Sequence, residues 1–442
     1  MKVWLGSLGC RLNQAEIEAM AAELRARGLG LAQLPEEAGI AIINTCSVTA
    51  AAAADSRGLV RRTHRRNPAA EIILTGCWST LEPARAAALP GVVRVVANDT
   101  KDALVAEVFC AARQGEAPSR YPREPIPGDR HRLRAFLKIQ DGCDQHCTYC
   151  VARLARGHSH SLPESAVLDH AREALAGGAQ EIVLTGVALS AYGSDRGAHG
   201  GLAQLIRRLL AETAVPRLRL SSLEPWAVSP ALLDALDHPA VCRHLHLPLQ
   251  SGARKTLHRM GRPSLPRAYA GSVAQARARL PGVRITTDLL VGFPGETEAE
   301  FGESLAFIEE LGFADAHIFR YSPRPGTPAA GFAESVPPHL ARQRAEHVRQ
   351  VVARSRHADE ASRQGQEEEV LWIRATAADS GLAGFQGLAR CGIRVQTTSA
   401  RNLINTRTAV RLGGPTAGGL CGFVLPTGLS DRRGSAGAEC GD

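Results

Sequence analysis

The chain has 442 residues, of which 44% are hydrophobic and 22% are charged, a composition typical of globular proteins. No run of about 18 apolar residues occurs, and the first residues lack the pattern of a signal peptide, so we expect a cytoplasmic protein without a membrane span. At about 100–200 residues per domain, the length predicts two to four domains. The net charge of +8 suits a polyanionic partner but does not identify one.

Residues 1–122 alternate between strand-like and helix-like segments. Apolar runs of strand length cover 2–9, 40–45, 71–76 and 92–96, and segments of helical composition cover 16–27, 50–66 and 80–88. Such alternation predicts a parallel sheet with helices on its faces, an α/β domain. The segment 114–130 is rich in Pro, Gly and charge, which is typical of a linker.

Residues 131–365 repeat the strand–helix pattern six times. The strand-like runs are 134–139, 181–185, 217–220, 243–247, 284–291 and 316–319, and a closing helix is predicted over 339–364. Six such units predict a partial (β/α)6 barrel, whose active site would lie at the C-terminal ends of its strands. Residues 366–430 contain short strands between Gly-rich turns, which favours a small β-barrel or sandwich, and 431–442 read as a disordered tail.

Three cysteines follow the first predicted barrel strand with C-x3-C-x2-C spacing: Cys143, Cys147 and Cys150. A cubane iron–sulfur cluster normally has four thiolate ligands, so three in one loop leave one iron open. An open iron can chelate the amino and carboxylate groups of S-adenosylmethionine (SAM), and an electron passed through it yields a 5′-deoxyadenosyl radical. The alternative is a structural zinc site, which needs a fourth protein ligand that only His146 or His158 offers nearby.

Polar residues and glycines recur where the predicted barrel strands end. Glycine lets a ligand approach the backbone closely, and polar side chains there can bind the ribose and methionine parts of SAM. Any one of these residues could belong to an ordinary turn, but their recurrence at strand ends favours a shared ligand site. The candidate SAM-binding residues are Thr185, Gly186, Ser222, Glu224, Gln250, Asp288 and Gly292.

A second set of cysteines, Cys10, Cys46 and Cys77, is dispersed along residues 1–122, yet each of them lies just past a predicted strand. Because the carboxyl ends of parallel strands meet at one edge of a sheet, we expect these three thiols to converge. The alternative is three core cysteines, since a free cysteine packs as a small hydrophobic residue. The equivalent placement of the three favours a second metal centre.

Two basic segments have the same pair of interpretations, a solvated surface or a phosphate-binding surface. Arg57, Arg61 and Arg65 recur every four residues and would form a stripe on one helix face. The segment 238–287 contains nine Lys or Arg residues and no acidic residue. The sequence favours neither interpretation for either segment.

These motifs resemble the methylthiotransferase family of radical SAM enzymes over nearly the whole chain. The segments SLGCRLNQAE, INTCSVTA and ILTGCWS are similar to the family's three N-terminal cysteine motifs, and FLKIQDGCDQHCTYC is similar to its cluster loop. Four further segments, LTGVALSAYG, RLRLSSLEPW, HLHLPLQSG and TTDLLVGFPGET, resemble the MtaB-like branch, which modifies N6-threonylcarbamoyladenosine beside the tRNA anticodon. Family members join an N-terminal methylthiotransferase domain, a radical SAM barrel and a small TRAM-type β domain.

The resemblance implies a role for each cysteine set. Cys143, Cys147 and Cys150 would hold a SAM-cleaving 4Fe–4S cluster, and Cys10, Cys46 and Cys77 an auxiliary 4Fe–4S cluster that carries or donates sulfur. One SAM would supply the methyl group and another the radical that abstracts hydrogen from adenine C2. The partners would be a tRNA anticodon loop, a sulfur donor and an electron donor of flavodoxin or ferredoxin type, with the enzyme acting as a monomer.

The chain departs from the family pattern after Cys150. Relatives commonly have a Pro-Tyr pair in an I-P-Y-x-R-G segment, whereas this chain has Arg153 and Leu154 before Arg156 and Gly157. His158 and His160 occupy positions where relatives usually have an arginine-bearing segment, so the edge of the active site after Cys150 differs from the family pattern. Alternative substrates are an isopentenyl adenosine in tRNA or a ribosomal protein side chain; a non-enzymatic iron–sulfur or RNA-binding protein is disfavoured by the open three-cysteine loop.

Overall fold

The computed structural model describes residues 1–109, 134–198, 200–263, 265–376 and 382–426. The predicted linker at 114–130 and the predicted tail at 431–442 lie outside these ranges. Within them, no helix is long and apolar enough to cross a membrane. The chain divides into two compact units, residues 1–353 and 354–442.

The N-terminal part of the first unit is a parallel sheet with strand order β2-β1-β3-β4-β5. The strands are β1 (Lys2–Ser7), β2 (Gly30–Leu31), β3 (Ile40–Thr45), β4 (Glu71–Gly76) and β5 (Val92–Val95). The helices are α1 (Arg11–Ala26), α2 (Ala50–Arg66), α3 (Cys77–Leu81), α4 (Pro83–Ala87) and α5 (Leu104–Val108). The predicted α/β sheet is therefore present, with β2 as an additional short edge strand.

One predicted helix, over 80–88, is divided in the structure. Glu82 has the non-helical torsions φ −129° and ψ 56°, and it separates α3 from α4. Pro83 causes the break, because it has no amide hydrogen and disfavours helical torsions in the residue before it. The break lets α3 begin directly at Cys77 and end after one turn.

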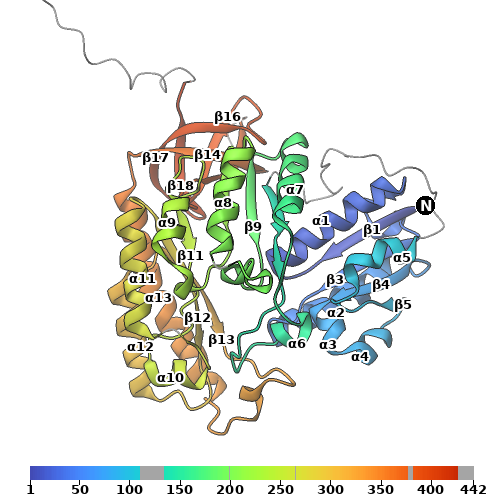
Figure 1. Cartoon of the computed structure of the whole chain (residues 1–442), viewed down its shortest axis with the longest axis horizontal. Helices are drawn as coiled ribbons and strands as arrows, with labels where there is room; N and C mark the ends of the chain where they lie inside the picture. The colour runs from blue at the N-terminus through green and yellow to red at the C-terminus, as the bar shows by residue number, and fades with distance from the viewer. Residues whose placement is uncertain (110–133, 199, 264, 377–381, 427–442) are drawn as a thin grey trace, which may run out of the picture. The chain divides into compact units, whose positions relative to one another are not determined.

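The larger part of the first unit contains six parallel strands (Figure 1). They are β6 (Arg134–Lys138), β9 (Glu181–Thr185), β10 (Leu218–Leu220), β11 (His244–His246), β12 (Arg284–Val291) and β13 (Asp315–Arg320). Single bridges from Leu218 to Val241 and from Ser222 to His246 join the two halves of the sheet. The predicted partial (β/α)6 barrel is confirmed.

Helices follow the barrel strands. Two short antiparallel strands, β7 (Gln140–Asp141) and β8 (His160–Ser161), pair at the base of the first loop. The helices are α6 (Ala152–Arg156), α7 (Glu164–Ala176), α8 (Gly201–Glu212), α9 (Pro230–Leu236), α10 (Arg254–Arg259), α11 (Pro266–Arg279), α12 (Glu298–Leu311) and α13 (Pro338–Ser362). Figure 1 shows α8, α9, α11 and α12 on the outside of the strands.

The two faces of the barrel strands carry different residues, as the two-residue period of a strand requires. Outward residues such as Ile182, Leu218 and Ile285 form the main apolar core with the surrounding helices. On the opposite face, Phe136 and Val183 pack against Ala15 of α1. Helix α1 of the N-terminal sheet domain therefore lies against the inner face of β6 and β9, where it reaches the barrel interior.

The inner face also holds a buried charge network around Glu181. Its carboxylate lies 2.9 Å from Arg217 Nη2, 3.0 Å from Arg219 Nε and 3.5 Å from Arg134 Nη1. Burial alone would raise the pKa of Glu181, but these three arginines hold that pKa below its ordinary range. The carboxylate is therefore ionised, and it compensates cations that would otherwise be buried together.

We expect Glu181→Gln to lower the free energy of unfolding by about 3–5 kcal/mol at neutral pH, because it leaves buried arginines without their carboxylate. A depressed pKa stabilises the fold above the ordinary Glu value of about 4.3. The gap between wild type and variant should therefore shrink as the pH falls below about 4.3 toward the depressed pKa. Urea denaturation at a series of pH values measures it. Glu212→Gln, which removes an exposed partner of Arg208, is the control, and equal stability of the two variants would refute the expectation.

The second unit contains a closed barrel with strand order β14-β15-β16-β18-β17, as predicted for the C-terminal section. The strands are β14 (Glu367–Thr376), β15 (Ala383–Ala389), β16 (Arg394–Ser399), β17 (Arg407–Thr416) and β18 (Gly419–Val424). The strand β15 is not apparent from the sequence, because Gly384 and Gly387 suggest turns. Gly387 instead allows close packing, since a Cβ there would lie 2.4 Å from Val370 Cγ1.

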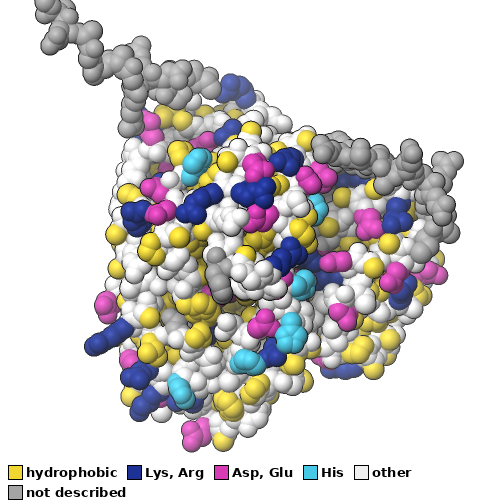
Figure 2. Space-filling model, in the orientation of Figure 1, with side chains coloured by type: hydrophobic (Ala, Val, Ile, Leu, Met, Phe, Trp, Pro, Cys, Tyr) yellow, Lys and Arg dark blue, Asp and Glu magenta, His cyan; other side chains and the backbone are white. Residues whose placement is uncertain are grey.

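The basic segment 238–287 is largely occupied by contacts within the protein. Arg243 pairs with Asp237, Arg259 with Glu300 and Arg279 with Asp234. Further arginines donate to backbone carbonyls, Arg277 to Leu311 and Arg284 to Ala314. On the face drawn in Figure 2, Lys and Arg side chains are interspersed with Asp and Glu. The structure favours the interpretation of this segment as a solvated, internally paired surface.

Candidate metal centres

Cys10, Cys46 and Cys77 come together at the carboxyl edge of the N-terminal sheet. They follow β1, β3 and β4, which are neighbours in that sheet. The thiols are close enough that Cys77 raises the pKa of both Cys10 and Cys46. Glycine makes the approach possible, since a Cβ on Gly9 (φ +98°) would lie 2.5 Å from Cys46 Sγ.

Amide side chains hold the segments that carry these thiols. Asn13 Nδ2 donates to the carbonyls of Leu8 at 2.8 Å and Thr45 at 3.1 Å, so it ties the ends of β1 and β3 together. Its Oδ1 lies 3.7 Å from Cys10 Sγ. Asn98 Nδ2 lies 3.8 Å from Cys77 Sγ and donates to the carbonyl of Ala155 at 2.6 Å. The thiols are therefore held by a polar framework, which core cysteines do not need.

The exposure of these cysteines tests whether a metal cluster would fit between them. Cys10 is exposed and Cys77 is half-buried, yet burial by surrounding protein is the main cause that raises the pKa of Cys10. The thiol of Cys10 is thus accessible although protein surrounds it on other sides. Burial also raises the pKa of Cys46 to about 11. Three thiols close enough to disfavour one another's ionisation suit a metal cation, which favours their thiolate forms.

Cys143, Cys147 and Cys150 lie in the loop between β7 and α6, past the carboxyl end of β6. Backbone amides point at two of the sulfurs, from Gln145 to Cys143 and from Ala152 to Cys150, each at 3.4 Å. Burial raises the pKa of Cys150 to about 11, while Cys150 is exposed. As in the first set, accessible thiols enclosed by protein fit an iron–sulfur cluster, whose potential such N–H···S bonds tune.

The loop is anchored next to Cys147. Thr148 donates its amide to the carbonyl of Met260 at 2.9 Å and its hydroxyl to that of Arg259 at 2.9 Å. Arg262 lies beside Cys147, packs over the ring of Trp226 and donates to the carbonyl of Pro248 at 2.7 Å. This guanidinium supplies positive charge next to the thiols, which stabilises their thiolate forms.

Gly142→Ala should disrupt the cluster loop. Gly142 has φ +68°, and a Cβ there would lie 1.8 Å from the carbonyl oxygen of His158, so the backbone must move. After reconstitution we expect about half the iron of wild type, because one of two predicted clusters is affected. Gly197→Ala is the matched control, since Gly197 has φ +72° but open space around its Cα. Iron and sulfide analysis distinguishes the two, and a full complement of iron in Gly142→Ala would contradict the expectation.

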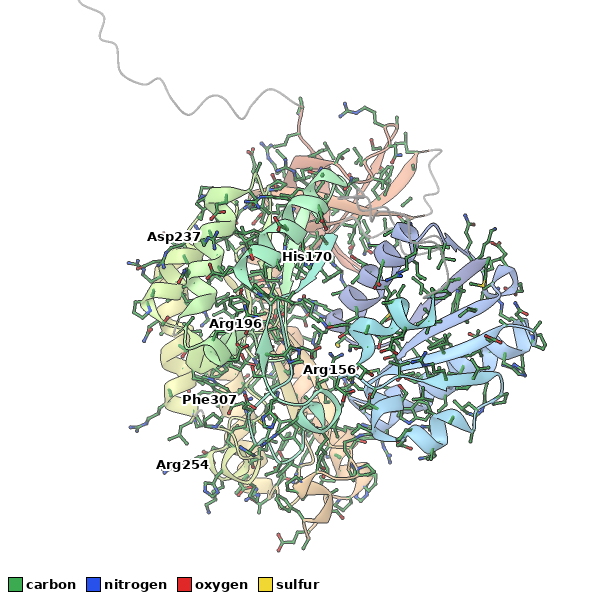
Figure 3. The ribbon with its side chains drawn as sticks, turned by 45° about the vertical axis from the view of Figure 1, so that its right-hand side comes forward. Arg156, His170, Arg196, Asp237, Arg254 and Phe307 are labelled. Atoms are coloured by element: carbon green, nitrogen blue, oxygen red, sulfur yellow. The ribbon has the colours of Figure 1, made fainter. Side chains whose placement is uncertain are left out.

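Arg156 connects the two cysteine sets. It lies on α6, just after the loop of Cys143, Cys147 and Cys150, where the N-terminal sheet domain meets the barrel (Figure 3). Its guanidinium lies 2.9 Å from Glu16 Oε1, 2.8 Å from Asp141 Oδ1 and 2.7 Å from Asn13 Oδ1. Burial alone would lower the pKa of Arg156, but Cys77, Glu16 and Asp141 raise it. This buried cation therefore fixes the position of one set relative to the other.

The unusual segment after Cys150 forms a regular helix. Val151–Gly157 contains α6, and Arg153 Nη1 lies 2.8 Å from His146 Nδ1. His158 Nδ1 lies 2.7 Å from Asp144 Oδ1. Both histidines that could complete a zinc site thus have other partners, which weakens the zinc alternative.

The predicted SAM-binding residues have different surroundings. Glu224 lies near Cys143, and burial raises the pKa of the Glu224 carboxyl. Gln250 has φ 71°, a conformation rare outside glycine, at the end of the fourth barrel strand. Thr185 and Gly186 end β9, where a Cβ on Gly186 would lie 2.8 Å from Gln140 Oε1.

Three other candidates have contacts within the barrel. The backbone of Ser222 forms a β-bridge with that of His246, and the Asp288 carboxylate is held by two histidines. A Cβ on Gly292 would lie 2.8 Å from the Cβ of Ala341 in α13, so this glycine serves packing. Their role in binding SAM stays a prediction.

Comparisons with known proteins agree with this architecture. Residues 137–308 match the model of the radical SAM superfamily, and residues 2–98 match that of uncharacterized protein family UPF0004. The structure of the radical S-adenosylmethionine methyltransferase TsrM from Kitasatospora setae covers 86% of this chain and 79% of its own, with a TM-score of 0.58 and 15% identity. That likeness shows the fold. The fold and the cysteine loop thus define a radical SAM enzyme.

Curated relatives narrow the class. The threonylcarbamoyladenosine tRNA methylthiotransferase MtaB of Thermotoga maritima is 37% identical over 77% of this chain and 80% of its own. The MtaB protein of Bacillus subtilis is 34% identical over 83% of each chain. The chain therefore belongs to the radical SAM methylthiotransferase family, and it is a transferase. Membership of this family implies SAM and 4Fe–4S clusters as cofactors.

Proposed function

We propose that this protein is a cytoplasmic enzyme that adds a methylthio group to C2 of N6-threonylcarbamoyladenosine at position 37 of tRNA, beside the anticodon. The observation that carries the proposal is the pair of three-cysteine sets, each brought together at the carboxyl ends of parallel strands and joined through Arg156. The MtaB relatives, aligned over most of the chain, support the choice of base.

In this proposal Cys143, Cys147 and Cys150 hold the SAM-binding cluster, and Cys10, Cys46 and Cys77 hold the auxiliary cluster. When bound, the clusters would pass on an electron from the external donor, and the clusters and SAM would supply the radical, the sulfur and the methyl group. The protein orients them: Arg262 and Arg156 place positive charge beside the two thiol sets. Helix α1 covers the inner face of β6 and β9 and limits access of water to the reacting atoms.

The tRNA must present a base from its anticodon loop, since a paired base cannot reach an enclosed site. The proposed backbone contact is on α2, where Gly58, Arg61, Arg62, His64, Arg65 and Pro90 line an open hollow. Arg57 of the same predicted stripe lies over the ring of Trp78 instead. The remaining partners in the proposal are a flavodoxin- or ferredoxin-type electron donor and a sulfur donor, with the protein acting as a monomer.

Mass spectrometry of digested tRNA tests the proposal, by comparing a strain that lacks this protein with its parent. The expected result is loss of the 2-methylthio form and accumulation of N6-threonylcarbamoyladenosine. Loss of methylthio isopentenyl adenosine would move the substrate to another adenosine. An unchanged nucleoside profile would contradict a tRNA substrate and direct attention to a ribosomal protein side chain.

A further inference from the structure

Among the described residues, Arg11 is a cation without an ion-pair partner, on the helix that packs against the inner face of the barrel. It is the first residue of α1 and directly follows Cys10. Helix α1 packs against the inner face of β6 and β9, and the charges that act on Arg11, from Arg134, Arg219, Glu181 and Asp288, all lie on barrel strands. In the described part of the chain, no carboxylate or carbonyl accepts a hydrogen bond from its guanidinium. The nearby Glu181 is already shared by three other arginines.

Burial and two neighbouring arginines lower the pKa of Arg11 to about 10, so the side chain stays charged at neutral pH. A partly buried guanidinium without a partner is costly, because each lost charge-assisted hydrogen bond leaves a desolvated donor. Its natural complement is an oxyanion, most favourably a carboxylate bound through two parallel hydrogen bonds. The surplus of positive charge on this face also favours an anionic ligand.

A second group of polar side chains faces the same interior from the opposite half of the sheet. Asp288 Oδ1 lies 3.2 Å from His246 Nε2 and 3.2 Å from His317 Nδ1. The hydrogen bond to Asp288 raises the pKa of His317, whose ring is more exposed than that of His246. Arg11 is among the charged groups that influence His317 and Asp288. Asp288 orients the ring of His317 through Nδ1, and in the protonated form, which Asp288 favours, the accessible Nε2 is a donor.

We propose that Arg11 and His317 bind the carboxylate of the substrate's N6-threonylcarbamoyl group and so select this base over one with an apolar N6 substituent. The inference rests on the proposed function and names the residues that determine its specificity. Because Arg11 follows Cys10, the bound carboxylate holds the base beside the auxiliary thiol set. An isopentenyl group would leave Arg11 unpaired in a partly desolvated site, which penalises that substrate.

Binding of anticodon stem-loops to the reconstituted full-length protein tests the inference without turnover. Three stem-loops differ only at position 37: one carries the threonylcarbamoyl group, one its neutral carboxamide and one unmodified adenosine. Wild type should bind the carboxylate form about 10- to 100-fold more tightly than the carboxamide, the range for a hydrogen-bonded charge pair. Arg11→Gln should remove this preference, while Arg11→Lys should retain part of it.

Two controls separate specificity from general damage. Arg85→Gln removes an exposed arginine of the same domain, whose partner is Glu82 on the surface, and should leave the preference intact. His317→Gln should reduce the preference without changing the affinity for unmodified adenosine.

Equal loss of affinity for all three stem-loops in Arg11→Gln would overturn the inference in favour of a phosphate contact. A stoichiometric divalent cation that survives chelation and depends on His246 and His317 would overturn it in favour of a metal site. If wild type methylthiolates no tRNA, the proposed function fails. If wild type does methylthiolate tRNA but Arg11→Gln keeps the carboxylate preference, only the inference fails.

Discussion

A Cys147→Ala variant is expected to form no 5′-deoxyadenosine from SAM under reducing conditions. Cys147 lies at the centre of the loop, between the Thr148 anchor and the guanidinium of Arg262. In the proposed site, a cluster that normally takes four thiolates would be held by three, and two ligands would not retain it. The iron content should fall to about half that of wild type, because the auxiliary set is untouched.

Chromatographic assay of 5′-deoxyadenosine, together with iron and sulfide analysis, measures this prediction. Cys421→Ala is the matched control, since Cys421 is a half-buried cysteine of the second unit. It should retain wild-type iron and SAM cleavage. If Cys147→Ala cleaved SAM at the wild-type rate, the assignment of the loop would be wrong, whatever the outcome for methylthio transfer.

Much of the fold is predictable because its parallel strands are buried on both faces and therefore appear as continuous apolar runs. Ile40–Thr45, Glu71–Gly76 and Glu181–Thr185 have the same bounds in the sequence prediction and in the structure. The short strand Gly30–Leu31 was missed because two residues establish no pattern. The convergence of the cysteines followed from their equivalent positions after neighbouring strands, a property of sheet topology rather than of local sequence.

The residues that surround the cysteines are harder to predict, because their partners are distant in sequence. Arg156 and Glu16 form an ion pair across 140 positions, and no local pattern indicates that pairing. Asn13 lies in the first turn of α1, three residues after the N-cap residue Cys10, and this closeness in sequence could have been noticed. Arg11 gives no signal in the sequence, because what distinguishes it is that no described residue pairs with it after folding.

A Cys46→Ala variant is expected to cleave SAM at close to the wild-type rate but to form no methylthiolated tRNA. The two thiol sets belong to different elements, so the loop of Cys143, Cys147 and Cys150 keeps its anchors when Cys46 is changed. Cys46 is buried, and its backbone is held through the Ser56 hydroxyl, which accepts from its amide at 2.9 Å. The substitution therefore removes a sulfur without freeing the segment that carries it.

The separation of two activities gives this prediction its force, because a misfolded variant would lose both. Single-turnover assays should show 5′-deoxyadenosine without the 2-methylthio nucleoside, and iron should again fall to about half. Cys391→Ala, which removes a buried thiol of the second unit, should keep both activities. Methylthiolated product from Cys46→Ala at the normal rate would show that the sulfur does not depend on this set. The convergence of Cys10, Cys46 and Cys77 at the carboxyl edge of the sheet would then be a matter of packing.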